Sequence, residues 1–130
     1  MGFGIKRPDI SYAVKDYGMD FRTERLLEAA KAKLWSPDII VEASGLRVAW
    51  CGDRIQKELG YAAEDIVGVS LREFVVLDGP GITDILFNLL SKEQTLIVTA
   101  IGKGGKQTKL RIMAESLAYE GRQYILGKIV

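Results

Sequence analysis

The sequence predicts a single α+β domain in which short helices cover one face of a five-stranded antiparallel sheet. Two strand-like segments lie towards the N-terminus and three lie at the C-terminus, with only helical patterns between them. Several of these strands carry apolar residues on both faces, so both faces of the sheet have to be covered. At 130 residues, the chain is long enough to bury a core of its own.

The N-terminal part divides into two segments. Residues 1–19 contain scattered glycines and a proline, which favours a flexible leader. Residues 20–35 are predicted to form an amphipathic helix, which Ser36-Pro37 ends. Two compatible roles stay open for this helix: packing on its own domain, or pairing with a second copy of the chain. Its apolar residues share one helical face and are the predicted dimer contact: Leu26, Leu27, Ala30 and Leu34.

Residues 36–130 contain the predicted sheet. β-Branched or alternating segments, separated by glycine-containing turns, are typical of strands and hairpins. Asp53 is expected to cap a short helix that ends at Gly60. The predicted strands are residues 38–43, 46–51, 94–101, 107–117 and 123–130.

The stretch from Gly60 to Leu71 predicts a compact corner of short helices. Gly60 and Gly68 can adopt positive φ and so break the chain twice within nine residues. The acidic pair Glu64-Asp65 suits the N-terminus of the short helix between them. Ser70 can cap the turn that follows, with Glu73 as its reciprocal partner.

A longer amphipathic helix is predicted between the corner and the C-terminal strands. Asp78 can cap it, and Pro80 suits its first turn. Its apolar residues recur at the spacing of one helical face: Ile82, Ile85, Leu86, Leu89 and Leu90.

The corner also resembles a known family. Gly-Tyr, two small residues, an acidic pair, Ile-Val-Gly and a hydroxyl-Leu pair resemble the central signature of PAS domains, which are sensory and interaction modules of signalling proteins. The resemblance runs from Trp35 to Val130. It implies a ligand cavity between sheet and helices, dimerisation through the N-terminal helix, and an output domain such as a kinase or a transcription regulator.

From the resemblance we expect one set of residues either to line a cavity or to fill that space as a packed core. These residues are Val48, Trp50, Ile55, Leu59, Ile66, Leu71, Phe74, Ile85, Leu89 and Ile112. The function that it implies is that of a prokaryotic sensory domain that binds a small ligand or mediates dimerisation. The alternative is a ligand-free homodimerisation module with a packed core.

Departures from the family leave the cofactor unknown. Light-oxygen-voltage domains, a PAS subclass, attach flavin to a cysteine in an Asn-Cys-Arg-Phe-Leu-Gln motif, whereas residues 75–78 here read Val-Val-Leu-Asp. The single cysteine, Cys51, lies elsewhere, and a buried structural role is expected for it. The chain has no histidine for a haem iron. Gly52 and residues 77–80 also differ from the Asn and the His-Pro-Asp-Asp of many PAS domains.

Composition excludes several other functions. Without histidine or a cysteine cluster, neither a zinc site nor a Ser-His-Asp or Cys-His catalytic centre can be built, so we expect no enzyme. The formal net charge of +1 does not favour nucleic acid, and no apolar run is long enough to cross a membrane. One cysteine is consistent with the reducing cytoplasm. A short basic stretch either solvates a sheet face or attracts an acidic partner: Lys103, Lys106, Lys109 and Arg111.

Overall fold

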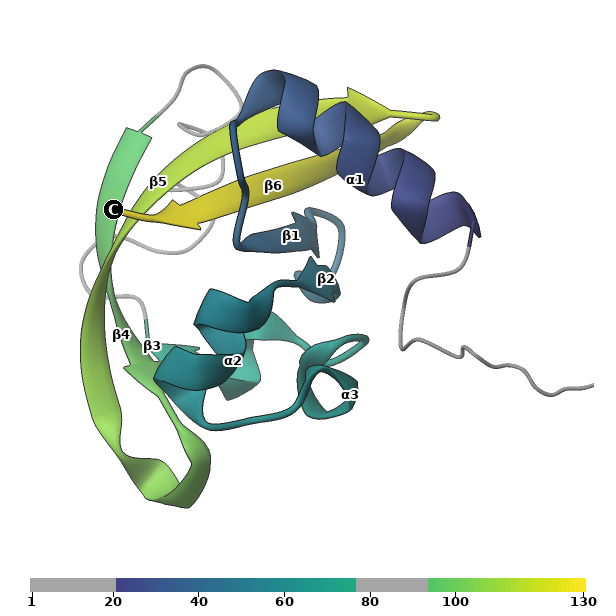
Figure 1. The fold of residues 1–130 in the computed structure, drawn as a ribbon. Coiled ribbons are helices and arrows are strands. Elements are labelled where there is room, and N and C mark those ends of the chain that lie inside the picture. The colour runs from purple at the N-terminus through teal and green to yellow at the C-terminus, as the bar shows by residue number, and fades with distance from the viewer. Residues whose placement is uncertain (1–20, 77–93) are drawn as a thin grey trace, which may run out of the picture.

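The computed structural model describes residues 21–76 and 94–130, which form a curled antiparallel sheet with helices on both faces (Figure 1). The strands lie in the order β2-β1-β6-β5-β4-β3. The elements are α1 (Phe21–Lys33), β1 (Ile39–Glu42), β2 (Arg47–Cys51), α2 (Asp53–Leu59), α3 (Ala63–Ile66), η1 (Leu71–Glu73), β3 (Val75–Val76), β4 (Gln94–Ile101), η2 (Lys103–Gly105), β5 (Gln107–Tyr119) and β6 (Arg122–Ile129).

The first strand and the last strand join the two halves of the chain into one sheet. β1 pairs with β6 in an antiparallel register that aligns Ile39 with Gly127 and Glu42 with Tyr124. The predicted α+β fold and its antiparallel sheet are therefore confirmed. The structure adds a sixth strand, β3, which extends the edge beside β4. It spans two residues, which is too short for a sequence pattern to reveal.

Helix α1 covers one face of the sheet and packs on the strands of its own chain. All four residues of the predicted dimer contact are buried, namely Leu26, Leu27, Ala30 and Leu34. They share a hydrophobic cluster with Ile40, Leu117, Tyr124 and Leu126. Figure 1 shows α1 lying across β5 and β6. The apolar stripe of α1 is thus occupied by its own domain, and a dimer contact through this helix would have to use its other face.

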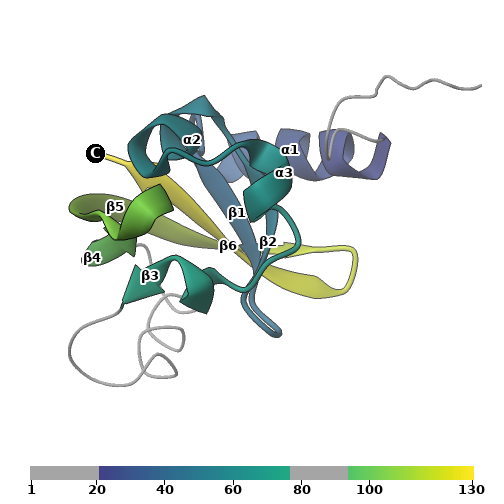
Figure 2. The same cartoon turned by 90° about the horizontal axis from the view of Figure 1, so that it is seen from below.

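The short helices cover the opposite face. Figure 2 shows α2 and α3 over β1 and β2. Ile55 and Leu59 of α2, Ile66 of α3 and Phe74 after η1 are buried in a second cluster with side chains of β4, β5 and β6. Ile66 is completely buried, which explains why so short a helix is stable: it is held by the sheet beneath it rather than by its own hydrogen bonds.

The glycine breaks of the corner have the predicted form, whereas Ser70 caps the turn through Arg72, and the Glu73 N–H donates to the Ser70 carbonyl at 3.0 Å. Gly60 ends α2 at a φ of 76°, and its N–H donates to the Gln56 carbonyl. Gly68 has a φ of 87°. Asp65 Oδ2 accepts from the Ala62 N–H at 3.3 Å, as an acidic residue in the first turn of a helix should. Ser70 Oγ accepts from the Arg72 N–H at 3.3 Å.

The expected cap at Asp53 is wrong by one residue. Gly52 is the N-cap of α2, and Asp53 is the first residue inside the helix. The reason lies in the backbone: the Gln56 N–H donates to the Gly52 carbonyl at 3.3 Å, so the first helical hydrogen bond already starts at Gly52. The helix therefore begins one residue earlier than predicted.

Two predicted segments fall outside the described residues, namely the leader at 1–19 and the longer helix at 82–90 with Ile85 and Leu89. Within the described ranges, no helix is long and apolar enough to cross a membrane.

Candidate functional site

A cavity of about 110 Å³ lies between the sheet and the short helices. α2 and α3 contribute residues from one side, and the inner faces of β4, β5 and β6 contribute from the other. Among the described residues its lining is entirely apolar: Ile39, Val41, Leu46, Ile55, Leu59, Ile66, Leu71, Phe74, Val75, Leu96, Val98, Ala100, Leu110, Ile112, Ala114, Ile125 and Gly127.

The structure places most of the predicted cavity residues around this space. They come from α2, α3, the η1 segment and β5, and all meet at the same cavity wall. The ones that line it are Ile55, Leu59, Ile66, Leu71, Phe74 and Ile112. Ile85 and Leu89 lie outside the described residues.

Val48 and Trp50 do not line the cavity, and a β-bulge turns Trp50 to the other side of the sheet. Val48 pairs with Val41, whereas Trp50 pairs with Ile40, so Ala49 is an extra residue between them. A bulge breaks the simple alternation of faces along a strand. Val48 consequently packs in the α2-side cluster, while Trp50 packs on the α1 side of the sheet. The prediction for Trp50 assumed a regular strand and is wrong, whereas Val48 lies on the expected side of the sheet but outside the cavity wall.

Apart from Ile112, the prediction missed the cavity residues on the central strands. Alternation along residues 107–117 already puts Leu110, Ile112 and Ala114 on one face, so that signal was present in the sequence. The pairing of Ala114 with Gly127 across β5 and β6 depends on register, which the sequence does not reveal.

Small residues on the central strands form part of the cavity wall, and larger side chains pack closely against them. Ala100, Ala114 and Gly127 contribute little side-chain volume to its wall. A Cβ atom added to Gly127 would lie 2.9 Å from Ile39 Cγ2 and 3.2 Å from Ile112 Cγ2. The aromatic rings of Tyr61 and Phe74 meet edge to face at the helical side of this core, with 5.7 Å between their centroids.

Cys51 is a buried free thiol at the end of β2, and it does not line the cavity. Burial, with a smaller contribution from the charge of Asp53, raises the pKa of Cys51 to about 11. The thiol therefore stays protonated at neutral pH. A thiol in that state is a poor nucleophile and a poor metal ligand.

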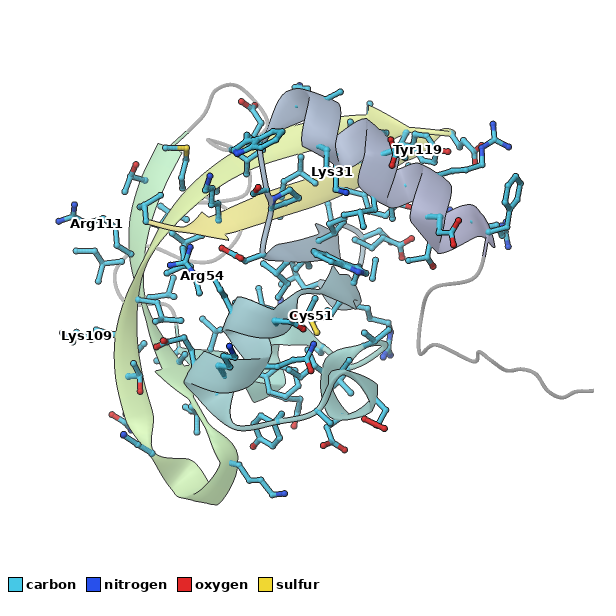
Figure 3. The ribbon with its side chains drawn as sticks, viewed as in Figure 1. Lys31, Cys51, Arg54, Lys109, Arg111 and Tyr119 are labelled. Carbon is cyan, nitrogen blue, oxygen red and sulfur yellow. The ribbon has the colours of Figure 1, made fainter. Side chains whose placement is uncertain are left out.

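The basic stretch is exposed in the structure. Lys103 and Lys106 lie in the hairpin turn around η2, while Lys109 and Arg111 lie on β5 and point away from the core (Figure 3). Arg111 pairs across the strands with Ile97, whose side chain is 66% exposed. Residues 21–76 and 94–130 contain no cluster of three side chains suited to a metal ion.

No protein-family model and no curated protein matches this chain, but solved structures with the same architecture do. The chain is similar to the PAS domain of an HTR-like protein from Haloarcula marismortui, with 21% identity and a TM-score of 0.57 over 84% of this chain and 98% of that one. It is also similar to a PAS domain from a two-component sensor histidine kinase, with 9% identity and a TM-score of 0.62 over 85% of this chain and 100% of that one.

The chain has the PAS fold. The same fold includes the light-oxygen-voltage protein of Rhodobacter sphaeroides, which shares 14% identity at a TM-score of 0.59 over 82% of this chain and 67% of that one. In terms of the PAS fold, the apolar cavity described above is the space between the helical cap and the inner face of the sheet.

Proposed function

We propose that this chain is a sensory module of a signalling protein and that it binds a small, uncharged, apolar molecule between sheet and helices. The observation that carries the proposal is the cavity of about 110 Å³ with its wholly apolar described lining. Two similar structures support the signalling context, since one is a PAS domain of a sensor histidine kinase and the other is the PAS domain of the nitrogen regulation protein NR(II) from Vibrio parahaemolyticus.

The chemistry of the lining limits the ligand. A charged or strongly polar molecule placed there would lose its hydrogen bonds to water and gain none from the described side chains, which costs several kcal/mol. The volume of the cavity is also small compared with the sites of about 300–1,000 Å³ that drug-sized ligands occupy. The ligand class that fits is a dissolved gas or a hydrocarbon-like molecule of a few heavy atoms.

The same features weigh against flavin and haem. The polar edge of a flavin and the propionates of a haem both need hydrogen-bonding partners, and the described lining offers none. The chain has no histidine to bind a haem iron, and the thiol of Cys51 is protonated and away from the cavity. We therefore propose that the chain lies outside the light-oxygen-voltage and histidine-ligated haem subclasses.

The proposal also covers the compartment, the oligomeric state and the output of the domain. We propose that the chain acts in the cytoplasm of a prokaryote as a homodimer, passes its signal to an output domain such as a kinase or transcription regulator, and catalyses no reaction itself. A dimer contact on α1 would use the exposed side opposite its buried stripe, where Glu24, Glu28 and Lys31 lie.

Native mass spectrometry of the purified protein tests the proposal. We expect a mass above that of the bare chain, and solvent extraction should release an apolar molecule. A retained polar or charged molecule would support a sensor and contradict the ligand class. A clean dimer that also binds no added apolar probe would instead favour the ligand-free dimerisation module.

A further inference from the structure

The side chains of Asp38 and Arg54 join three separate parts of the chain at the end of β6. Asp38 precedes β1, Arg54 lies in the first turn of α2, and Ile129 is the last residue of β6. Of the residues that the structure describes, Asp38 alone is a buried charged side chain, with 7% of its surface exposed. A buried carboxylate is costly unless it is paired, so its partners indicate what holds it there.

Both backbone polar groups of Ile129 are held by this pair. The Ile129 N–H donates to Asp38 Oδ2 at 2.8 Å. The Ile129 carbonyl accepts from Arg54 Nη1 at 3.1 Å. The two side chains also face each other, with 3.8 Å between Arg54 Nη1 and Asp38 Oδ2. We call Asp38, Arg54 and the backbone of Ile129 the clasp.

The backbone of Asp38 extends the clasp into both neighbouring elements. Its N–H donates to the Gly127 carbonyl at 2.7 Å, and its carbonyl accepts from the Gly52 N–H, which precedes α2. Figure 3 shows the Arg54 side chain between α2 and the end of β6. The start of α2 and the end of β6 are therefore linked through one buried carboxylate and one guanidinium.

The clasp is also adjacent to the cavity. Arg54 is followed directly by Ile55, which lines the cavity, as does Leu59 one turn later. On the strand side, Ile129 pairs with Ile112 of β5, another lining residue. Because packed interiors transmit small displacements rather than absorb them, a shift of α2 against the cavity has to move Arg54 relative to Ile129.

We propose that the clasp couples the position of α2 to the end of β6, so that a change in the cavity alters how firmly Ile129 is held. The coupling is a shift between a closed clasp and one in which Arg54 has left the Ile129 carbonyl. Its meaning as a signal rests on the sensory function proposed above, whereas the mechanical coupling does not, because its test needs no ligand.

Hydrogen exchange of the Ile129 amide, followed by NMR, measures the clasp directly. Arg54→Gln removes the charge and the forked donor, and we expect the Ile129 amide to exchange about threefold faster or more. Arg47→Gln is the matched control, because Arg47 Nη1 also donates to a backbone carbonyl, that of Gly68 at 3.0 Å, away from β6. The amide of Leu126, in the middle of β6, corrects for changes in global stability.

A double-mutant cycle separates coupling from simple support. Ile55→Val changes the cavity wall from α2, and we expect it to change the Ile129 exchange rate in the wild-type background but not together with Arg54→Gln. Ile66→Val changes the wall from α3 and should act equally in both backgrounds. Asp38→Asn keeps the side-chain volume, removes the charge and should weaken the same coupling.

Equal effects of Ile55→Val in both backgrounds would overturn the proposal, as would an Ile129 exchange rate that Arg54→Gln leaves unchanged. A failure to find any retained ligand would sink the sensory function instead and leave these exchange rates as they are. The two proposals can therefore fail separately.

Discussion

At the scale of single residues, Cys51 shows how burial decides chemistry. Its thiol lies in the core next to the start of α2, a position that could have activated it if the helix terminus or Arg54 had dominated. Burial dominates instead and raises the pKa of Cys51 to about 11 from an ordinary value of 9.0. The residue acts as a small apolar side chain, which is the structural role that the sequence favoured.

This shift predicts a pH-dependent contribution of Cys51 to stability. The folded state keeps the thiol proton up to a pH near 11, while the unfolded state loses it near pH 9. The contribution is therefore complete below pH 9 and is lost as the pH rises towards 11, with a total of roughly 2–3 kcal/mol for two pH units. Urea unfolding at both ends of this window, for wild type and Cys51→Ala, measures it. Wild-type stability relative to the variant should fall as the pH rises, and a constant difference would contradict the assignment.

Gly102 is the second residue whose identity the packing requires. Its backbone is extended, with a φ of −85°, so conformational freedom is not the reason for a glycine here. A Cβ atom at this position would lie 2.7 Å from the carbonyl oxygen of Leu59, at the end of α2. The hairpin between β4 and β5 thus rests directly on the last residue of the helix.

We expect Gly102→Ala to destabilise the protein by about 1–3 kcal/mol, because the hairpin and the end of α2 must move apart to make room for the added Cβ atom. Thermal or urea unfolding checks this. Lys106→Ala, an exposed substitution in the same turn, serves as the control and should stay within about 0.5 kcal/mol of wild type. If both variants are equally stable, the hairpin and the helix are not in the contact described.

At the scale of elements, the sequence predicted the helices and strands better than their faces. The strands at residues 38–51 and 94–130 and the helix that follows Cys51 show clear periodicity or glycine breaks, and they formed within a few residues of their expected bounds. The face of Trp50 could not be predicted, because a bulge between Val48 and Trp50 depends on the pairing with β1. The two-residue strand β3 exists only because β4 lies beside it.

The N-terminal helix makes the next prediction. Leu27 is 8% exposed and packs on the sheet of its own chain. We expect Leu27→Ala to cost about 2–5 kcal/mol in the free energy of unfolding, because the change leaves a cavity under α1. The loss should not depend on protein concentration, and the oligomeric mass by light scattering should be unchanged. Lys57→Ala, at an exposed position of α2, is the control for stability.

If Leu27 contacts a second copy instead, Leu27→Ala should shift the mass towards the monomer, and its cost should grow as the protein is diluted. That result would contradict the packing of α1 on its own domain and would make the buried stripe the dimer contact that the sequence left open.

At the scale of the whole molecule, one curled sheet separates two hydrophobic clusters, and only one of them surrounds the cavity. The α1-side cluster is filled by Leu26, Leu27, Ala30 and their strand partners. The other cluster surrounds the cavity, where small residues on β4, β5 and β6 stand among larger ones. The sequence predicted that both faces would be covered, but not where space would remain, since that depends on the register that sets Ala114 opposite Gly127.

The binding of xenon to this cavity is the most direct test of the account, because xenon enters apolar cavities and requires no hydrogen bond. Under xenon, we expect the methyl NMR signals of Ile55 and Leu110 to shift in the wild type. Ala114→Val, which adds two carbons at the cavity wall, should abolish the shifts. Ala118→Val, the same change at an exposed position of β5, should leave them intact. Wild-type signals that do not respond, or a response that Ala114→Val leaves unchanged, would contradict an apolar binding site between the sheet and its helices.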